Sequence, residues 1–382
     1  MNISYDEQFP LATGIIYLNH AAVAPLPKCT ADAIAQFTDE NLHQGASHYP
    51  RWLEVEQSLR ERCRALLNAA SADDIALVKN TSEALSMVAH GLEWQPGQNV
   101  VTAWEEFPSN RMVWQSLSRY GVETRFVRIS GLQDPEQALL EACDDNTHLL
   151  AISAVQYASG LRMDLERLGQ ACKDAGRLFC VDAIQMIGAL PFDVQTIQAD
   201  FVMADGHKWM LAPEGLALFW TREQSRKLLK LYEYGWHMAE NMYDFDAHDW
   251  QPAVSGRRFE CGSPNMFGVH ALHASLGLLL DVGLDTVSRN ILKNTSYLID
   301  YIDNNDALEL LSDARESRRS GIVTFRHRGM ESHALHQHLM ANKVICAERG
   351  GGIRFSPHFY TTRQDLDTVL GLLGRLPGLP AG

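Results

Sequence analysis

Short apolar runs alternate with longer amphipathic segments through the middle of the chain. Runs rich in β-branched and aromatic residues predict seven strands, at 75–79, 99–103, 123–129, 148–155, 178–182, 201–204 and 216–220. Between them, apolar residues three and four positions apart predict helices at 82–92, 109–120, 135–142 and 165–175. Helices that cross over between successive strands are typical of an α/β fold whose mostly parallel sheet is covered on both faces.

The pattern changes near residue 265. Two long helical patterns at 266–281 and 286–303 precede predicted strands at 321–327 and 353–356, and an amphipathic segment at 364–373 follows. We therefore expect two domains. The large one spans 26–264, and the smaller α+β one combines 1–25 with 265–382.

Charge and composition exclude several classes of function. The 382 residues include 33 Lys and Arg against 47 Asp and Glu, and the net charge of −14 repels nucleic-acid phosphates and anionic lipids. The seven cysteines form no CxxC pair, so neither a disulfide framework nor a zinc knuckle is indicated. The first residues lack the features of a signal peptide, and no apolar run approaches the roughly 18 residues of a membrane span. We expect a cytoplasmic protein with no nucleic-acid partner, no membrane and no metal.

A lysine and an aspartate each stand at the end of a predicted strand. Lys208 follows the run at 201–204, beside His207, and Asp182 closes the run at 178–182. Open α/β sheets bind ligands outside the carboxyl ends of their strands. Two interpretations of Asp182 remain open: a cap for a following helix, or a carboxylate that holds a protonated ring nitrogen, as pyridoxal phosphate requires.

Two further segments follow strands. Asn80-Thr81-Ser82-Glu83 has the spacing of a capping box, and its N–H and hydroxyl groups suit either a helix cap or a bound phosphate. Phe107 follows the strand at 99–103, and it is either a core aromatic or a ring that stacks on a planar cofactor.

Motifs spread over nearly the whole chain resemble the class V aminotransferase family, which includes cysteine desulfurases, kynureninases and isopenicillin-N-epimerase-like proteins. In chain order these motifs are Tyr17-Leu18-Asn19-His20-Ala21-Ala22, Asn80-Thr81-Ser82-Glu83-Ala84-Leu85, Val181-Asp182-Ala183-Ile184-Gln185, Gly206-His207-Lys208, Arg258-Phe259-Glu260-Cys261-Gly262-Ser263-Pro264-Asn265 and Arg354-Phe355-Ser356-Pro357-His358-Phe359-Tyr360. The resemblance implies pyridoxal 5'-phosphate as cofactor and the aspartate-aminotransferase-like fold type I. It also implies a homodimer with its active site at the subunit interface.

The resemblance also implies roles for individual residues. Lys208 would form a Schiff base with the cofactor and then act as the general base, and Asp182 would pair with the pyridine nitrogen. The other implied cofactor-binding residues are Thr81, Ser82 and His207 at the phosphate, Gln185 at the phenolic oxygen, Phe107 at the ring, Asp205 in place of a serine common in the family, and Ser263, which reaches the partner subunit's phosphate. Arg354, with Arg349 and Asn19, would bind the amino-acid substrate.

One departure from the family narrows the reaction. Cysteine desulfurases carry a nucleophilic cysteine on a loop between positions that correspond to Arg349 and Arg354. Here that interval is Gly350-Gly351-Gly352-Ile353, and we interpret the three glycines as a mobile loop over the substrate. Because it contains no cysteine, desulfurase activity is disfavoured, and we expect transamination or C–S β-elimination.

Epimerisation or racemisation of an amino acid or peptide is the alternative. It needs a second proton donor, for which His20, His48 and Tyr157 are candidates. A dinucleotide-binding protein is disfavoured because no glycine fingerprint is present, and a catalytically silent binding module is disfavoured by Lys208.

Overall fold

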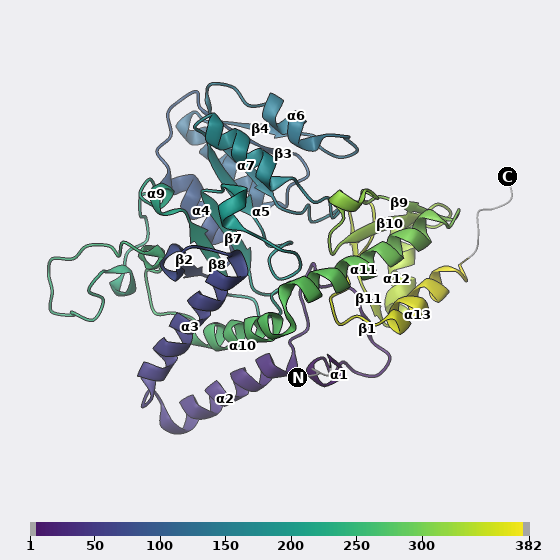
Figure 1. Ribbon diagram of the computed structural model, residues 1–382, viewed down its shortest axis with the longest axis horizontal. Coiled ribbons are helices and arrows are strands. Elements are labelled where there is room, and N and C mark those ends of the chain that lie inside the picture. The colour runs from purple at the N-terminus through teal and green to yellow at the C-terminus, as the bar shows by residue number, and fades with distance from the viewer. Residues whose placement is uncertain (1–4, 377–382) are drawn as a thin grey trace.

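The computed structural model describes residues 5–376 and has a seven-stranded mixed sheet at its centre (Figure 1). In spatial order the strands are β2 (Ile75–Val78), β8 (Ala217–Thr221), β7 (Phe201–Asp205), β6 (Leu178–Asp182), β5 (Thr147–Ser153), β3 (Asn99–Ala103) and β4 (Glu123–Val127). β8 is antiparallel to both of its neighbours, so the other six strands point the same way. The prediction of a mostly parallel seven-stranded sheet is confirmed.

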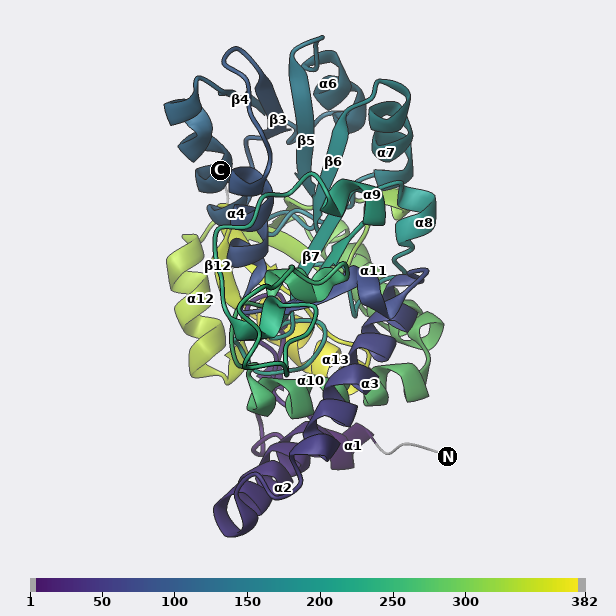
Figure 2. The ribbon, with the colours of Figure 1, turned by 90° about the vertical axis from the view of Figure 1, so that its left-hand side faces the viewer.

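Helices cover both faces of this sheet, and α4 and α7 lie on opposite sides of it (Figure 2). The connecting elements are α4 (Thr81–Gly91), α5 (Ser109–Gln115), η2 (Ser116–Tyr120), α6 (Pro135–Glu141), α7 (Leu165–Asp174), α8 (Val194–Ile197) and α9 (Glu223–Arg226). Within β6, Phe179 and Val181 belong to one apolar cluster and Cys180 to the cluster on the other face. Burial on both faces explains why these strands are continuous apolar runs in the sequence.

Two long helices near the N-terminus were not predicted. They are α2 (Lys28–Gln44) and α3 (Tyr49–Leu67), and both pack against α10 (Met266–Val282). α2 buries only Thr30 and Phe37, so its apolar stripe is too sparse to stand out in the sequence. No single helix among residues 5–376 is long and apolar enough to cross a membrane; α10 passes such a test only together with α11 (Leu284–Asp303), at 82° to it.

The C-terminal elements gather on one side of the molecule around an apolar cluster of their own (Figure 1). Their four-stranded antiparallel sheet has the order β12 (Ala347–Arg349), β13 (Gly352–Phe355), β10 (Val323–His327) and β9 (Leu308–Leu310). The remaining helices and strands are α1 (Tyr5–Gln8), α12 (Ser332–Ala341), α13 (Arg363–Leu373) and β1 (Ile16–Tyr17), which pairs in parallel with β11 (Val344–Ile345). The domain limits given above stay a prediction.

The segment at Gly350 is a tight turn. Arg349 pairs with Gly352 across the β12–β13 hairpin, so only Gly350 and Gly351 lie between the strands. Their φ angles of 60° and 79° are in the left-handed region, which two-residue hairpin turns favour and glycine adopts without strain. Our interpretation of a mobile loop over the substrate was wrong. The two glycines form a tight turn that requires positive φ angles.

We expect opposite effects of alanine at two helical glycines. Gly169 in α7 is buried, and a Cβ there would overlap the carbonyl oxygen of Ile197, so Gly169→Ala should lower the free energy of unfolding by about 1–3 kcal/mol. Gly371 in α13 has room for a Cβ, so Gly371→Ala should raise the free energy of unfolding by about 0.5–1 kcal/mol. Urea unfolding of both variants measures the contrast, and a stabilising Gly169→Ala would contradict the packing described.

Candidate functional site

The topology of the central sheet brings the predicted chemistry to one edge. β2, β3, β5, β6 and β7 all end at that edge, because β8 alone is reversed. Asp182 and Asp205 are the last residues of β6 and β7, and Lys208 lies in the turn after β7. Thr81 begins the helix after β2, and Phe107 follows β3. The prediction that these residues stand at strand ends is confirmed.

Lys208 is largely buried at this edge. Its Nζ atom lies 5.7 Å from the centroid of the Phe107 ring, whose side chain is partly exposed. Burial lowers the pKa of Lys208 to about 8; the charge of Asp182 opposes this shift and that of Arg354 adds to it. The amine therefore loses its proton far more readily than a solvated lysine, as a general base near neutral pH requires.

Asp182 is a buried carboxylate with little local compensation. It is 3% exposed, and its one hydrogen bond comes from the Ile184 N–H at 3.1 Å. Burial raises its pKa to about 7, and Glu106 adds to the rise while Lys208 opposes it. The residues after Asp182 form turns, and the next helix, α8, begins only at Val194, so the helix-cap interpretation was wrong.

Gln185 is held rigidly behind these groups. Its amide donates to the carbonyl of Ala21 at 3.0 Å, and its Oε1 accepts from the indole of Trp209 at 2.9 Å. These contacts fix the orientation of the amide and leave one N–H for another acceptor. Sequence reasoning missed Trp209, which directly follows Lys208 and is fully buried. Its position next to the lysine was the one available signal.

The start of α4 offers donors for an anion. Asn80 caps the helix by accepting from the Glu83 N–H at 2.9 Å, so Thr81 is not needed for capping. The Thr81 hydroxyl is buried without a hydrogen-bond partner. The Ser82 hydroxyl donates to that of Ser109 at 2.8 Å, and this hydrogen bond joins the starts of α4 and α5. The helix-cap interpretation is therefore confirmed for Asn80. Unpaired N–H groups at a helix start attract phosphate, and phosphate binding by Thr81 and Ser82 stays a prediction.

His207 and Asp205 form a pair beside Lys208. The Nδ1 atom of His207 lies 2.9 Å from Oδ1 of Asp205, and both side chains are largely buried. Neither of these two atoms makes a hydrogen bond with a described residue, so the two side chains are neighbours by distance alone. The contact of Asp205 with the cofactor phosphate stays a prediction.

Arg354 presents a guanidinium with spare donors. β13 places it in the interior at 2% exposure, where its Nη1 donates to the carbonyl of Tyr157 at 2.7 Å and its buried Nε has no partner. Burial lowers its pKa to about 10, and the charge of Arg349 adds to this effect. Arg349, by contrast, is exposed and donates to the carbonyl of Glu348. Asn19 bridges to Ser356 and keeps its side-chain oxygen buried and unpaired.

Glu106 is a second buried carboxylate that sequence reasoning passed over. It accepts from the Ser153 N–H at 2.7 Å, the Gln156 amide at 2.8 Å, the Asn110 amide at 2.8 Å and the Ser153 hydroxyl. These bonds tie the segment before Phe107 to the end of β5. An acidic residue directly before Phe107 at a strand end was the available signal.

The three candidates for a second proton donor differ in their surroundings and in whether they lie by the site. Both ring nitrogens of His20 are engaged, with the carbonyl of Ser356 and the hydroxyl of Tyr360, and burial lowers its pKa to about 4. His48 is an exposed residue 3.6 Å from Glu40. Only Tyr157 lies by the site, with its ring 5.2 Å from that of Phe107.

Ser263 and two cysteines lie apart from Lys208. Ser263 is exposed and lines a cavity with Lys79 and other residues of its own segment, so its role at a partner's phosphate stays a prediction. Cys346 is buried, which raises its pKa to about 12, and burial also raises the pKa of Cys261. Neither thiol has the low pKa of a reactive nucleophile.

These residues fit pyridoxal phosphate. Asp182 lacks an ion-pair partner within 4 Å among the described residues, and a protonated pyridine nitrogen would supply one. The orphaned hydroxyl of Thr81 suits a phosphate oxygen, and the buried Nζ of Lys208 suits attachment to an aldehyde.

A buried acidic group elsewhere serves the fold. Glu56, His237 and Glu260 place ligand atoms within 4.8 Å of one another. Arg60, however, donates to Glu56 at 2.6 Å and to both oxygens of Glu260 at 2.6 and 2.8 Å. Because the guanidinium occupies the carboxylates, the group is an ion-pair network between α3 and η4 (Gly256–Phe259).

Comparison with known proteins agrees with this geometry. A family model described as Aminotransferase class-V matches residues 16–369. A probable cysteine desulfurase from Methanothermobacter thermautotrophicus is 29% identical, with 97% of this chain and 96% of that protein aligned. The uncharacterized aminotransferase YcbU from Bacillus subtilis is also 29% identical, over 95% of this chain and 94% of its own length.

Solved structures share the fold at lower identity. The apo cysteine desulfurase from Thermococcus onnurineus NA1 superposes with a TM-score of 0.88 at 24% identity, over 98% of each chain. The cystine C–S lyase C-DES, in complex with its product cysteine persulfide, superposes with a TM-score of 0.90 at 20% identity, over 96% of this chain and 99% of that one. The fold-type expectation is thereby confirmed.

The pKa of Lys208 should respond to its two charged neighbours in opposite directions. In cofactor-free protein, the pH dependence of Lys208 acylation should have its midpoint near 8. Asp182→Asn removes a negative charge that favours the ammonium, so it should lower the midpoint; Arg354→Gln removes a positive charge, so it should raise it. Peptide mass spectrometry across pH measures this, with exposed Lys28 as the internal control. Shifts of reversed sign would disprove the assigned electrostatics.

Proposed function

Because the chain belongs to the aminotransferase class-V family of pyridoxal-phosphate enzymes, we propose that it acts on an α-amino acid and cleaves a C–S bond by β-elimination. Transamination by the same residues is the competing outcome. The observation that carries this proposal is the largely buried Lys208, whose pKa is lowered by burial and shifted by the charges of Asp182 and Arg354. No cysteine among the described residues has the lowered pKa of a reactive thiol at this edge. The names of similar proteins, desulfurases and a C–S lyase, support sulfur-containing substrates.

The chain's own side chains would hold the cofactor by its distinct groups. Thr81, Ser82 and His207 would bind the phosphate, Asp182 would keep a proton on the pyridine nitrogen, and Gln185 would donate its free N–H to the phenolic oxygen. When bound, pyridoxal phosphate supplies an electron sink for the negative charge that develops at the substrate Cα.

Arg354 and Lys208 would handle the substrate. Arg354 has donors left for a bidentate contact with the α-carboxylate, which orients the Cα–H bond toward Lys208. Lys208, with its pKa lowered to about 8, would accept the Cα proton. The Cβ–S bond then breaks, and cysteine would yield pyruvate, ammonia and sulfide.

Epimerisation remains the second candidate because of Tyr157. Its ring lies beside Phe107, and its carbonyl accepts from Arg354. A hydroxyl near the bound substrate would serve as the second proton donor that inversion at Cα requires.

A homodimer is part of the proposal. The segment between α9 and η4 projects from the rest of the molecule (Figure 1), and it exposes several large aromatic side chains. These are Tyr232, Tyr234, Tyr243, Phe245 and Trp250. Such a group favours burial against another protein surface, and exposed Ser263 follows in the same region of the chain.

Lys208 should be the cofactor's attachment residue. Borohydride reduction of wild-type protein should leave a pyridoxyl group on the Lys208 peptide, and Lys208→Ala should lose both this label and the yellow colour. Lys79→Ala is the matched control, since exposed Lys79 also follows a strand but pairs with Glu83 at 2.9 Å. A pyridoxyl-labelled lysine peptide in Lys208→Ala would exclude the assignment.

Cysteine as substrate distinguishes the reactions. We expect pyruvate and sulfide in equal amounts, with no persulfide on the protein, because the Cys346 and Cys261 thiols have raised pKa values. Cys261→Ser and Cys346→Ala should therefore keep the wild-type rate. Mass spectrometry that finds a transferable persulfide on either residue would contradict the proposal, and a stoichiometric gain of amine by the cofactor would indicate transamination.

The oligomeric state tests the projecting aromatic segment. Sedimentation should give a dimer, and the double variant Phe245→Ser, Trp250→Ser should shift it toward monomer because both side chains are exposed in one chain. Met340→Ser on α12 removes an exposed apolar side chain outside this segment and should leave the dimer intact. A fully active wild-type monomer would refute the dimer.

A further inference from the structure

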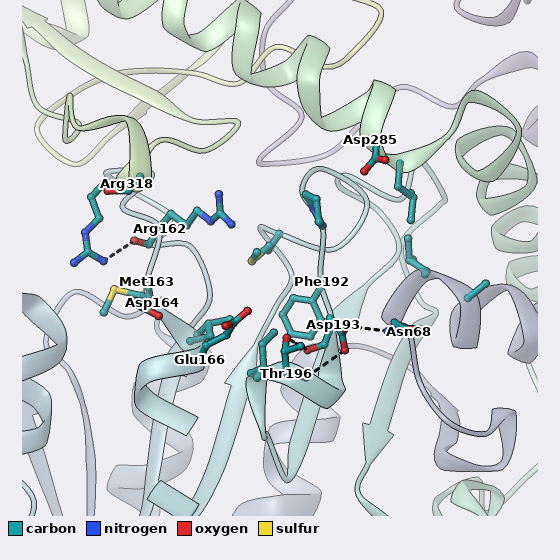
Figure 3. Close-up of a pocket in the computed structure, with 18 residues that line it drawn as sticks. Asn68, Arg162, Met163, Asp164, Glu166, Phe192, Asp193, Thr196, Asp285 and Arg318 are labelled. Carbon is teal, nitrogen blue, oxygen red and sulfur yellow. Dashed lines mark hydrogen bonds between the residues drawn. The ribbon is translucent and has the colours of Figure 1, made fainter. Parts of the chain in front are cut away.

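A cavity of about 650 Å³ lies apart from the Lys208 site. It forms where the end of α3, the segments after β5 and β6, the start of α11 and η5 (Glu316–Arg318) meet (Figure 3). Its size is within the range of small-molecule sites, roughly 300–1,000 Å³. None of the residues assigned to the cofactor or to the proposed substrate lines it, although Met186 in its wall directly follows Gln185.

Arg162 extends into this cavity (Figure 3). Its side chain is partly buried, and its guanidinium makes no hydrogen bond or ion pair within residues 5–376. The neighbouring Arg318 differs, because its guanidinium donates to both oxygens of Glu136 at 2.6 and 2.7 Å. A partly buried cation without a partner favours an anionic group from a ligand.

The four acidic residues of the lining are of two kinds: two cap helices, and Glu166 and Asp285 accept no hydrogen bond from a described residue. Asp164 and Asp193 cap α7 and α8 by accepting from Arg167 N–H at 3.1 Å and Gln195 N–H at 2.8 Å. Asp285, in the first turn of α11, accepts no hydrogen bond from a described residue (Figure 3). It is therefore available to a cationic group.

Apolar side chains complete the wall. Phe192 and Met186 are 6% and 4% exposed, and the Phe192 ring faces the space in Figure 3. The lining carries more acidic than basic side chains, so it disfavours a dianion such as a phosphate monoester. A ligand with one carboxylate, an apolar middle and a cationic end matches all three features.

We propose that this cavity is a second small-molecule site, which binds a basic α-amino acid with its carboxylate on Arg162, its side-chain ammonium on Asp285 and its methylene groups against Phe192. The site joins the start of α11 and η5 to loops of the central sheet, so its ligand contacts elements that belong to different parts of the chain. It does not depend on the reaction at Lys208.

Titration calorimetry with L-lysine as the probe tests the site in holoenzyme carrying Arg354→Ala, which removes the carboxylate-binding residue of the Lys208 site. We expect one L-lysine per chain. Adding Arg162→Gln or Asp285→Asn should weaken binding by about tenfold or more, the loss of one charge-assisted hydrogen-bonded contact. Arg326→Gln is the matched control, because Arg326 is exposed on β10 and pairs with Glu309 at 2.8 Å.

Two analogues test the two ends of the ligand. L-Norleucine lacks the side-chain ammonium and cadaverine lacks the carboxylate, so each should bind about tenfold more weakly than L-lysine. The proposal is overturned if Arg354→Ala holoenzyme does not bind L-lysine, or if Arg162→Gln and Asp285→Asn both bind it as tightly as their parent. Should Arg162→Gln fail to fold, Asp285→Asn decides alone. L-Norleucine that matches L-lysine would overturn the assignment to Asp285.

Discussion

Burial of Asp182 and Lys208 at one edge of the sheet is the constraint on which the site depends. Burial makes each group costly to ionise, because it raises the pKa of Asp182 and lowers that of Lys208. The charge of each group partly offsets the pKa shift of the other. Their pKa values therefore approach neutrality from opposite sides. The reversed direction of β8 matters here, since β2 on its far side then runs parallel to β7, and the start of α4 lies at the same edge of the sheet as Asp182 and Lys208.

Trp209, the residue after Lys208, connects this part of the chain to the rest of the fold. The indole bonds to Gln185, and the backbone carbonyl of Trp209 contacts the ring of His358 at 3.2 Å. A Cβ at Gly321 would overlap the same indole, so this C-terminal segment can approach it only as glycine. One buried side chain thus links the lysine to the amide of Gln185 and to the C-terminal elements.

Sequence reasoning succeeded where burial is two-sided or the chemistry is local. The strands around Phe179 and Val181 are continuous apolar runs, so their positions and strand ends could be predicted. α2 was missed because it buries only two side chains. The segment at Gly350 was wrongly interpreted as a mobile loop because glycines occur both in flexible loops and in tight turns. The contact between Ser82 and Ser109 joins helices 27 positions apart, and no periodicity carries such information.

The two-residue turn at Gly350 and Gly351 also bears on how this scaffold can change. Hairpin tips lie outside the ladder of backbone hydrogen bonds, and added residues there cost mainly the slowly growing entropy of loop closure. Gly350 lies against Ala158, next to Tyr157, whose carbonyl accepts from Arg354, so a longer insert would start close to the proposed substrate-binding residue. The hairpin is accordingly a point at which this chain could gain residues beside Tyr157 and Arg354 while the strands on either side keep their pairing.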